Sequence, residues 1–149
     1  MRAVVQRVRQ ARVFVRDKVQ AQIGSGLVVL IGVGQDDNEA DATYLADKIA
    51  RLRIFDDSEG KLNLSVTDIN GEVLVVSQFT LLGEVHKGRR PSYAKAAPAA
   101  KAAQLYRQVI ARFKTHQLRV SEGKFQEYML VEIANDGPVT ILLDSKKTF

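Results

Sequence analysis

The N-terminal part of the chain consists almost entirely of strand-forming segments separated by tight turns, and this pattern restricts the fold more than any other feature. Apolar and basic residues alternate in stretches of residues 1–16, whose β-branched content favours a strand. Asp17-Lys18 is typical of a tight turn, residues 19–23 continue as a strand, and Gly24-Ser25-Gly26 turns again. The continuous apolar run 27–33 then predicts a buried strand. We therefore expect three or four antiparallel strands at the start of the fold.

Two later segments have the spacing of amphipathic helices. The first covers roughly residues 38–53 and begins at Asn38, a good N-cap residue that is followed by acidic side chains. The second begins near Pro98, because the missing N–H of proline costs nothing at the first helical position. The apolar residues at helical spacing are Leu45, Ile49 and Leu52 in the first helix and Leu105, Val109 and Phe113 in the second.

The remaining apolar segments predict further strands over residues 72–80, 118–121, 127–134 and 138–143. The last two are separated by Asn135-Asp136-Gly137. The order ββββ-α-β-α-βββ does not alternate as in a parallel α/β fold, so we expect an α+β fold. Its sheet should be curved, mostly antiparallel, partly closed and barrel-like, with two helices outside. A chain of 149 residues can bury a sizeable core, and we expect one domain over residues 1–149.

Composition excludes several kinds of chemistry. The chain has no cysteine, which removes thiol catalysis, disulfide frameworks and thiolate zinc sites. Its two histidines, His86 and His116, are too few for a typical zinc site, so we expect neither a metal nor a cofactor. The longest apolar run falls far short of the roughly 20 residues that a membrane span requires, and the opening residues do not resemble a signal peptide. We therefore expect a cytoplasmic protein.

Charge is distributed in blocks along the chain. Lys and Arg minus Asp and Glu gives 6 − 1 = +5 for residues 1–20 and 4 − 10 = −6 for residues 35–72. Residues 85–120 contain nine basic side chains and no carboxylate. This block predicts a polyanionic partner such as nucleic acid, because bound phosphates would relieve its self-repulsion. The alternative is an ordinary solvated helix face. His86 fits a phosphate contact, and His116 fits a cation at a helix C-terminus.

Two segments have features that a purely structural role does not require. Ser77-Gln78-Phe79-Thr80 places polar groups at the end of an apolar strand, where they must find partners or face a cavity. Hydroxyls and N–H groups there could bind a carbonyl and stabilise its oxyanion, or could merely hydrogen-bond across the sheet. Residues 135–140 (NDGPVT) are compatible with an ordinary hairpin turn and also with a rigid segment that contacts a ligand.

Four segments together resemble the D-aminoacyl-tRNA deacylase family. They are residues 1–8 (MRAVVQRV), 77–81 (SQFTL), 87–92 (KGRRPS) and 135–140 (NDGPVT). They stand in the family's order and at its separations, so the resemblance covers nearly the whole chain. Tyr93 is a small departure, since the family pattern has phenylalanine there.

The resemblance implies an enzyme of translation quality control that hydrolyses the ester between a D-amino acid and the terminal adenosine of tRNA. It also implies removal of glycine from a wrong tRNA, and a homodimer in which Gly137-Pro138 of one subunit enters the other subunit's pocket as a cis dipeptide. Carbonyls and the proline ring would crowd the face toward which an L side chain projects, whereas a D side chain points elsewhere. Glycine has neither hand, so this filter admits it.

The resemblance also assigns roles to individual residues. The residues implied to line the pocket are Ser77, Gln78, Phe79 and Thr80, with the main chain at Phe79 and Thr80 holding the adenosine or the scissile carbonyl. Arg7 should brace the cross-subunit Gly-Pro loop, and Met129 should pack near the pocket. Thr80 is the candidate nucleophile, but threonine needs an adjacent base and the sequence offers none. We therefore favour water activated by the terminal ribose 2′-hydroxyl, with the protein supplying orientation and oxyanion stabilisation.

Two other functions remain open at this point. A non-catalytic nucleic-acid-binding module would explain the basic block of residues 85–120, although not the polar end of the apolar strand. A hydrolase of small aminoacyl esters that ignores RNA would explain the pocket, although not the charge. Incubation with D-tyrosyl-tRNA tests the binding module, which would bind the RNA tightly and leave the ester intact. The salt dependence of activity on full-length tRNA and on aminoacyl adenosine tests the small-ester hydrolase.

Overall fold

The computed structural model describes residues 1–149, and its central element is the long strand β1 (Arg2–Val15). One edge of β1 pairs antiparallel with β3 (Gly26–Gly32) and then with β2 (Lys18–Ile23). The other edge pairs antiparallel with β8 (Leu130–Asp144), a strand of 15 residues. The turn after β1 lies at Arg16 and Asp17, both with positive φ, one residue earlier than predicted.

The rest of the main sheet is parallel. Strand β6 (Glu72–Ser77) pairs parallel with β3, and β7 (Arg119–Glu122) pairs parallel with β6. Each pair is connected through a helix, α1 (Glu39–Ala50) before β6 and α2 (Ala99–Thr115) before β7, because parallel neighbours need a long crossover. Antiparallel pairs still outnumber parallel ones, three to two.

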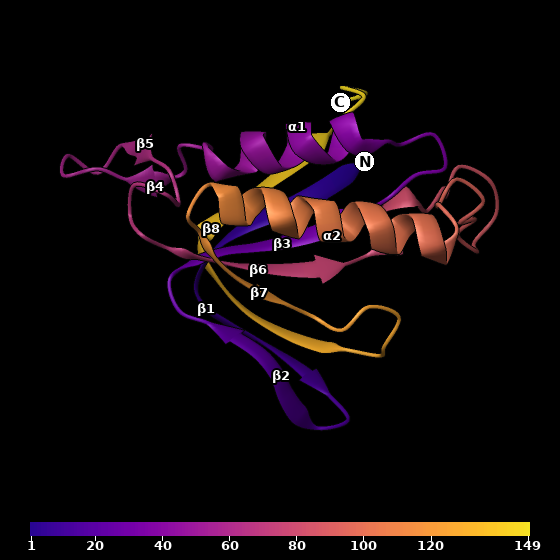
Figure 1. Ribbon diagram of the computed structural model, residues 1–149, viewed down its shortest axis with the longest axis horizontal. Coiled ribbons are helices and arrows are strands. Elements are labelled where there is room, and N and C mark those ends of the chain that lie inside the picture. Colours follow the sequence, from indigo (N-terminus) through magenta and orange to yellow (C-terminus); the bar gives the residue numbers. More distant parts are fainter.

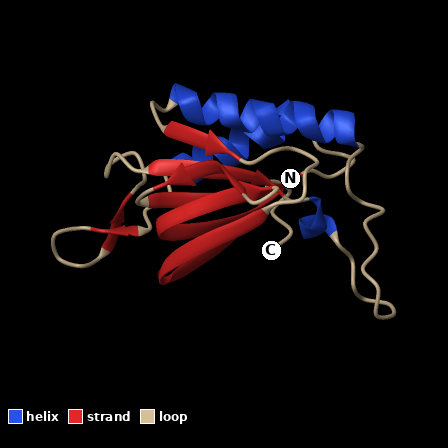
Figure 2. Ribbon diagram, turned by 90° about the horizontal axis from the view of Figure 1, so that it is seen from below, coloured by secondary structure: helices blue, strands red, loops and turns tan.

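The predicted α+β fold is confirmed, with a curved, barrel-like sheet and two helices outside it (Figures 1 and 2). The helices lie side by side and bury Leu45, Ile49, Val109 and Phe113 against one face of the sheet. The other face buries a smaller cluster that includes Val13, Val28 and Leu74. The sheet is therefore apolar on both faces along much of its length.

Both helices begin near the predicted residues, although Pro98 stands one position before the first helical residue rather than at it. The side chain of Asn38 caps α1 by accepting from the backbone N–H of Ala40, and Asp41 completes a capping box. Pro98 is the N-cap of α2. Helix α1 ends at Ala50, three residues before the predicted end at 53. Neither helix is long and apolar enough to cross a membrane.

The predicted strand 72–80 is too long. It ends at Ser77, and residues Phe79–Leu82 form a short 3-10 helix, η1. The chain turns back over Gly32, where a Cβ would lie 2.6 Å from Cδ2 of Leu82 and 2.9 Å from the carbonyl oxygen of Gln78. The missing side chain at position 32 is what lets η1 fold against the end of β3.

The two predicted C-terminal strands, 127–134 and 138–143, are one strand. Both halves of β8 pair antiparallel with β1, so Asn135-Asp136-Gly137 does not form a hairpin. Gln6 pairs with Thr140 and Val8 with Asn135, which leaves Arg7 opposite the four residues 136–139. Those residues form a large bulge, because the turn residues disrupt the ladder without reversing the chain. A small separate hairpin, β4 (Phe55–Asp56) with β5 (Leu62–Leu64), surrounds the turn residues 57–60.

Candidate active site

A cleft of about 800 Å³ opens where β6 ends. The end of β6, η1, the start of α2 and the segment before β8 all contribute to its wall. Its lining residues are Val76, Ser77, Gln78, Phe79, Thr80, Ala97, Ala99, Ala102, Phe125, Gln126, Glu127, Tyr128, Met129 and Val131. Five residues that the sequence singled out, Ser77 to Thr80 and Met129, therefore share one cavity.

The polar groups of this cleft are arranged around Thr80. Its exposed hydroxyl donates a hydrogen bond to Oε1 of Gln78 at 2.6 Å. No histidine or carboxylate is hydrogen-bonded to Thr80, and Glu127 is the only charged side chain that lines the cleft. The first N–H groups of a helical turn have no intrahelical acceptor, so the backbone of Phe79 and Thr80 can donate to a ligand. The site can therefore orient and polarise a carbonyl without a side-chain base.

Aromatic side chains stand at the cleft and beside it. The Phe79 ring is 56% exposed and meets the Tyr93 ring edge to face, with their centroids 5.0 Å apart. Tyr128 is 93% exposed. Exposed aromatic faces of this kind are suited to stacking on nucleobases. Tyr93 packs here through its ring, so its extra hydroxyl relative to the family pattern does not disturb the contact.

The Gly-Pro bulge of β8 is built around Arg7. The side chain of Arg7 is buried, and its Nε donates to the carbonyl of Asp136 at 3.3 Å while its Nη1 donates to the carbonyl of Ile54 at 2.9 Å. Gly137 has φ +116°, and the Gly137-Pro138 peptide bond is cis. Nδ2 of Asn135 donates to the carbonyls of Arg7 and Val139 at 2.9 and 3.0 Å. Arg7 therefore braces the Gly-Pro segment of its own chain.

The bulge and the cleft lie at different places on the sheet. The bulge lies opposite Arg7, which pairs with Leu27 of β3. The cleft begins at Ser77, which pairs with Ile31, four residues further along β3. Four residues correspond to about 13 Å along the strands, and β3 lies between β1 and β6. Gly137 and Pro138 are exposed and do not line the cleft. Within one chain, the structure brings these two predicted binding residues nowhere near Thr80.

The histidines lie outside the cleft. His116 caps the end of α2, as predicted, and its Nε2 lies 2.7 Å from Oδ1 of Asp47 on α1. The Arg112 guanidinium binds the same carboxylate with contacts of 2.6 and 2.8 Å and, with a smaller contribution from His116, lowers the pKa of Asp47 to about 2 despite partial burial. This cluster clamps the two helices together. His86 lies in an exposed loop.

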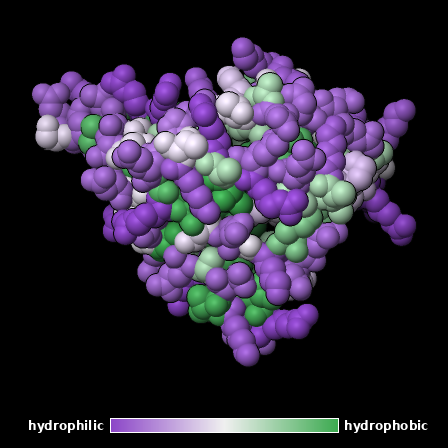
Figure 3. Space-filling model, viewed as in Figure 1, coloured by the Kyte–Doolittle hydropathy of each residue, from purple (hydrophilic) through white to green (hydrophobic).

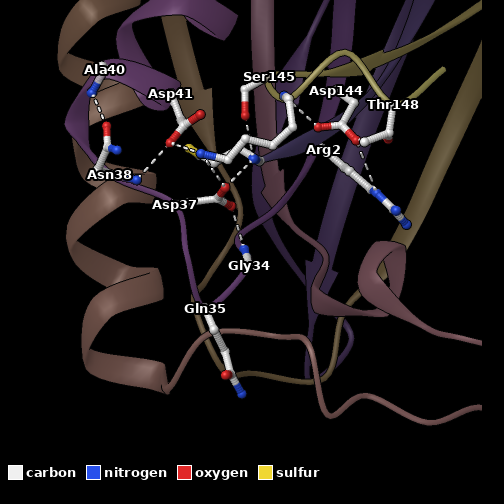
Figure 4. A network of polar contacts seen from close by, with 12 residues as sticks. Arg2, Gly34, Gln35, Asp37, Asn38, Ala40, Asp41, Asp144, Ser145 and Thr148 are labelled. Atoms are coloured by element: carbon white, nitrogen blue, oxygen red, sulfur yellow. Dashed lines mark hydrogen bonds and ion pairs between the residues drawn. The ribbon is translucent and has the colours of Figure 1, made fainter.

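A second polar network ties the C-terminal segment to the start of α1, and sequence reasoning missed it (Figure 4). Asp37 is buried and accepts a hydrogen bond from the Gly34 N–H at 2.6 Å, and Nζ of Lys146 binds Asp41 at 2.9 Å. The charged residues are more than 100 positions apart, so no local pattern could reveal the pairing. No group of three or more His, Asp or Glu side chains in the structure has the arrangement of a metal site.

Known proteins resemble this chain over its whole length. A family model described as D-Tyr-tRNA(Tyr) deacylase matches residues 4–144. The chain is 56% identical over 149 residues to a D-aminoacyl-tRNA deacylase of Thermosipho africanus and 58% identical over 149 residues to one of Desulforamulus reducens, each match covering 100% of both proteins. Among solved structures, the c-Myc DNA Unwinding Element Binding Protein matches with a TM-score of 0.90 and 40% identity, covering 97% of this chain and 98% of that one.

A more distant structure, described as a probable eukaryotic D-amino acid tRNA deacylase, shares the fold. Its TM-score is 0.82 at 19% identity, and the match covers 95% of this chain and 97% of the other.

Proposed function

The chain belongs to the D-Tyr-tRNA(Tyr) deacylase family and is a hydrolase of the ester bond in D-aminoacyl-tRNA, and we propose that it cleaves this ester in the cleft beside η1. The observation that carries the proposal is the position of residues 77–80. They form the polar end of an otherwise buried strand and open into a cavity of about 800 Å³, within the usual size range of small-molecule sites. Residues 1–149 form one deacylase domain in this proposal.

The chemistry follows from the groups that surround Thr80. Its hydroxyl is already bonded to Gln78, and no adjacent base is present to make it a nucleophile. The 2′-hydroxyl of the terminal ribose therefore activates the attacking water, accepting its proton while passing its own proton to the neighbouring 3′-oxygen, which leaves as the acyl C–O bond breaks. The protein holds the activated ester in place through Ser77, Gln78 and Met129, and the main-chain N–H groups of Phe79 and Thr80 stabilise the oxyanion.

Selection against L-amino acids comes from a second copy of the chain. The Gly137-Pro138 segment is exposed and lies about 13 Å along the strands from the level of its own cleft, so it can serve as a filter only in a neighbouring subunit. Arg7 holds that segment in shape through its bond to the Asp136 carbonyl. An L side chain collides with the inserted segment, whereas a D side chain avoids it and glycine has no side chain to collide. The enzyme therefore also clears glycyl-tRNA.

The exposed edge of β8 supports a homodimer. Strand β8 pairs only with β1, so its other edge has unpaired backbone groups. Leu130 and Leu142 on this strand are 59% and 60% exposed. Figure 3 shows apolar side chains at the bottom of the molecule, in the region where Figure 1 draws β1 and β2, with hydrophilic side chains around them. A second copy that covers the β8 edge would bury Leu130 and Leu142.

The test is the hydrolysis of D-tyrosyl-, L-tyrosyl- and glycyl-tRNA by the purified protein, together with its mass in solution. We expect release of D-tyrosine and glycine, rates for L-tyrosyl-tRNA lower on the order of a hundredfold or more, and a dimer. Equal rates for both enantiomers, or full discrimination by a monomer, would contradict the cross-subunit filter. An intact D-ester on tightly bound tRNA would point instead to a binding module.

A further inference from the structure

Residues 84–92, here called the basic loop, project from the molecule directly beside the cleft. The loop is closed at its base by an antiparallel bridge, with Glu84 N–H donating to the Ser92 carbonyl at 2.8 Å and the Ser92 N–H donating back at 2.9 Å. In Figure 2 a long loop extends outward from the short helix η1, away from the sheet and both long helices. Gly88, at φ +73°, makes the turn within it. The bridge therefore presents the intervening residues to solvent.

The charges of the basic loop are unpaired. Lys87, Arg89 and Arg90 are exposed, and none of them takes part in an ion pair or a side-chain hydrogen bond within the chain. By contrast, most arginines of the sheet and helices have a carboxylate partner. The only carboxylate of the loop, Glu84, accepts a hydrogen bond from the backbone N–H of His86 at 2.5 Å. Three cations within four residues repel one another unless an external anion binds.

The residues on either side of the basic loop connect it to the cleft. It begins two residues after the end of η1, whose Phe79 and Thr80 line the cavity. The residue after the loop, Tyr93, packs edge to face against Phe79 with ring centroids 5.0 Å apart. A ligand held at Phe79 and continuing outward would therefore pass the base of the basic loop.

We propose that Lys87, Arg89 and Arg90 bind phosphates of the tRNA acceptor arm while the aminoacylated 3′ end occupies the cleft. The inference rests on the proposed function, because that function places an RNA strand at the mouth of this cavity. Arginine forks match phosphate oxygens bidentately, and lysine adds a point charge. Contacts of this kind position the RNA without reading its sequence. A single large apolar side chain, Val85, lies in the loop, so the surface does not have the composition of a protein interface core.

The chain offers a matched control at the opposite end of the helices. Lys48 and Arg51 lie at the end of α1, and Lys114 lies at the end of α2, next to the Asp47 clamp. All three are exposed and have no ion pair. Lys114 belongs to the basic block of residues 85–120, so the comparison also tests whether phosphate contacts within that block are confined to its loop end. Helix α2 is 17 residues long and has its start at the cleft, which puts Lys114 about 20 Å away along the helix. Figure 1 shows the basic loop at the right and the ends of both helices at the left.

The experiment compares two triple variants with the unaltered enzyme. The test variant carries Lys87→Gln, Arg89→Gln and Arg90→Gln, and the control carries Lys48→Gln, Arg51→Gln and Lys114→Gln, so that both lose the same charge. Each enzyme is assayed on D-tyrosyl-tRNA and on D-tyrosyl adenosine, a substrate with no acceptor arm, at several salt concentrations. Circular dichroism confirms that each variant is folded.

We expect the test variant to lose about tenfold or more in kcat/KM on D-tyrosyl-tRNA at low salt, mainly through KM. Its slope of log(kcat/KM) against log salt should become shallower by about 2 to 3, since each neutralised phosphate contributes roughly 0.7 to 0.9. Activity on D-tyrosyl adenosine should not change, and the control variant should match the unaltered enzyme on both substrates. Equal losses in the two variants on tRNA, or no loss in either, would overturn the proposal. Failure of the unaltered enzyme on both substrates would instead overturn the proposed function.

Discussion

Arg7 holds the backbone at Asp136, the residue immediately before the Gly-Pro pair. Its Nε donates to the Asp136 carbonyl at 3.3 Å, and its Nη1 donates to the buried carbonyl of Ile54 at 2.9 Å. The bulge of β8 and the segment before β4 are thus joined through one buried guanidinium, whose planar set of donors can reach both.

Replacing Arg7 by methionine should lower the free energy of unfolding by about 2 kcal/mol, because the Ile54 carbonyl loses its partner inside the protein. Urea denaturation measures the change. The matched control is Arg9→Met, since Arg9 also pairs with Asp136 but is 82% exposed, and its loss should cost less than about 1 kcal/mol. Equal effects of the two substitutions would contradict the bracing role of Arg7.

Gly137→Ala should damage the chiral filter. The residue has φ +116°, and an added Cβ would lie 2.9 Å from Cγ2 of Val139 and 3.0 Å from Nη2 of Arg7. The segment must therefore shift, and we expect the ratio of D- to L-tyrosyl-tRNA hydrolysis to fall about tenfold or more. Gly60→Ala is the control, because Gly60 also has positive φ but nothing lies within 4 Å of its Cβ position. An unchanged ratio in Gly137→Ala would remove the Gly-Pro segment from the filter.

Thr80→Ala should reduce kcat by less than about tenfold, since the hydroxyl supplies a hydrogen bond rather than the attacking atom. Loss of a true nucleophile would cost on the order of 10⁴ or more. Single-turnover hydrolysis of D-tyrosyl-tRNA distinguishes the two. A substrate whose terminal 2′-hydroxyl is replaced by hydrogen should be almost inert. Severe loss with Thr80→Ala and little effect of the deoxy substrate would reverse the assignment.

The helix clamp should make the protein sensitive to acid. The hydrogen bond from Arg112 lowers the pKa of Asp47 from 3.8 to about 2 in the folded state. A carboxyl with a lowered folded-state pKa stabilises the protein above its unfolded pKa, and this contribution disappears as the pH falls from about 4 to 2. Because the pair is partly exposed, the contribution should be on the order of 1 kcal/mol.

Denaturation of Asp47→Asn across this pH range tests the clamp. Its free energy of unfolding should be lower than that of the unaltered protein at pH 7, and the two should converge near pH 2. Glu59→Gln removes an exposed carboxylate that pairs only with Lys61 and should change stability by less than about 0.5 kcal/mol. Parallel pH curves for Asp47→Asn and the unaltered protein would contradict the clamp.

Local patterns predicted the helices and most strands correctly. Apolar spacing identified Leu45, Ile49, Val109 and Phe113 as core residues, and Asn38 and Pro98 marked the helix starts. These features depend on neighbours within one turn of helix or two residues of strand. The strand end at Ser77 could not be predicted in this way, because it depends on the empty space over Gly32, more than 40 positions earlier.

Short stretches of the sequence are enough to identify the two helices, most of the strands, the apolar faces, the basic residues 87–90 and the family resemblance. Long-range pairing with β1 makes Leu130–Asp144 one strand that continues past Asn135-Asp136-Gly137, and it places Arg7 opposite the resulting bulge. Packing of the segment before β8 near the end of β6 brings Met129 and residues 77–80 into one cleft. These contacts join segments that are 50 to 130 positions apart in the sequence. They depend on strand pairing and side-chain packing across the whole sheet, and no local periodicity encodes them.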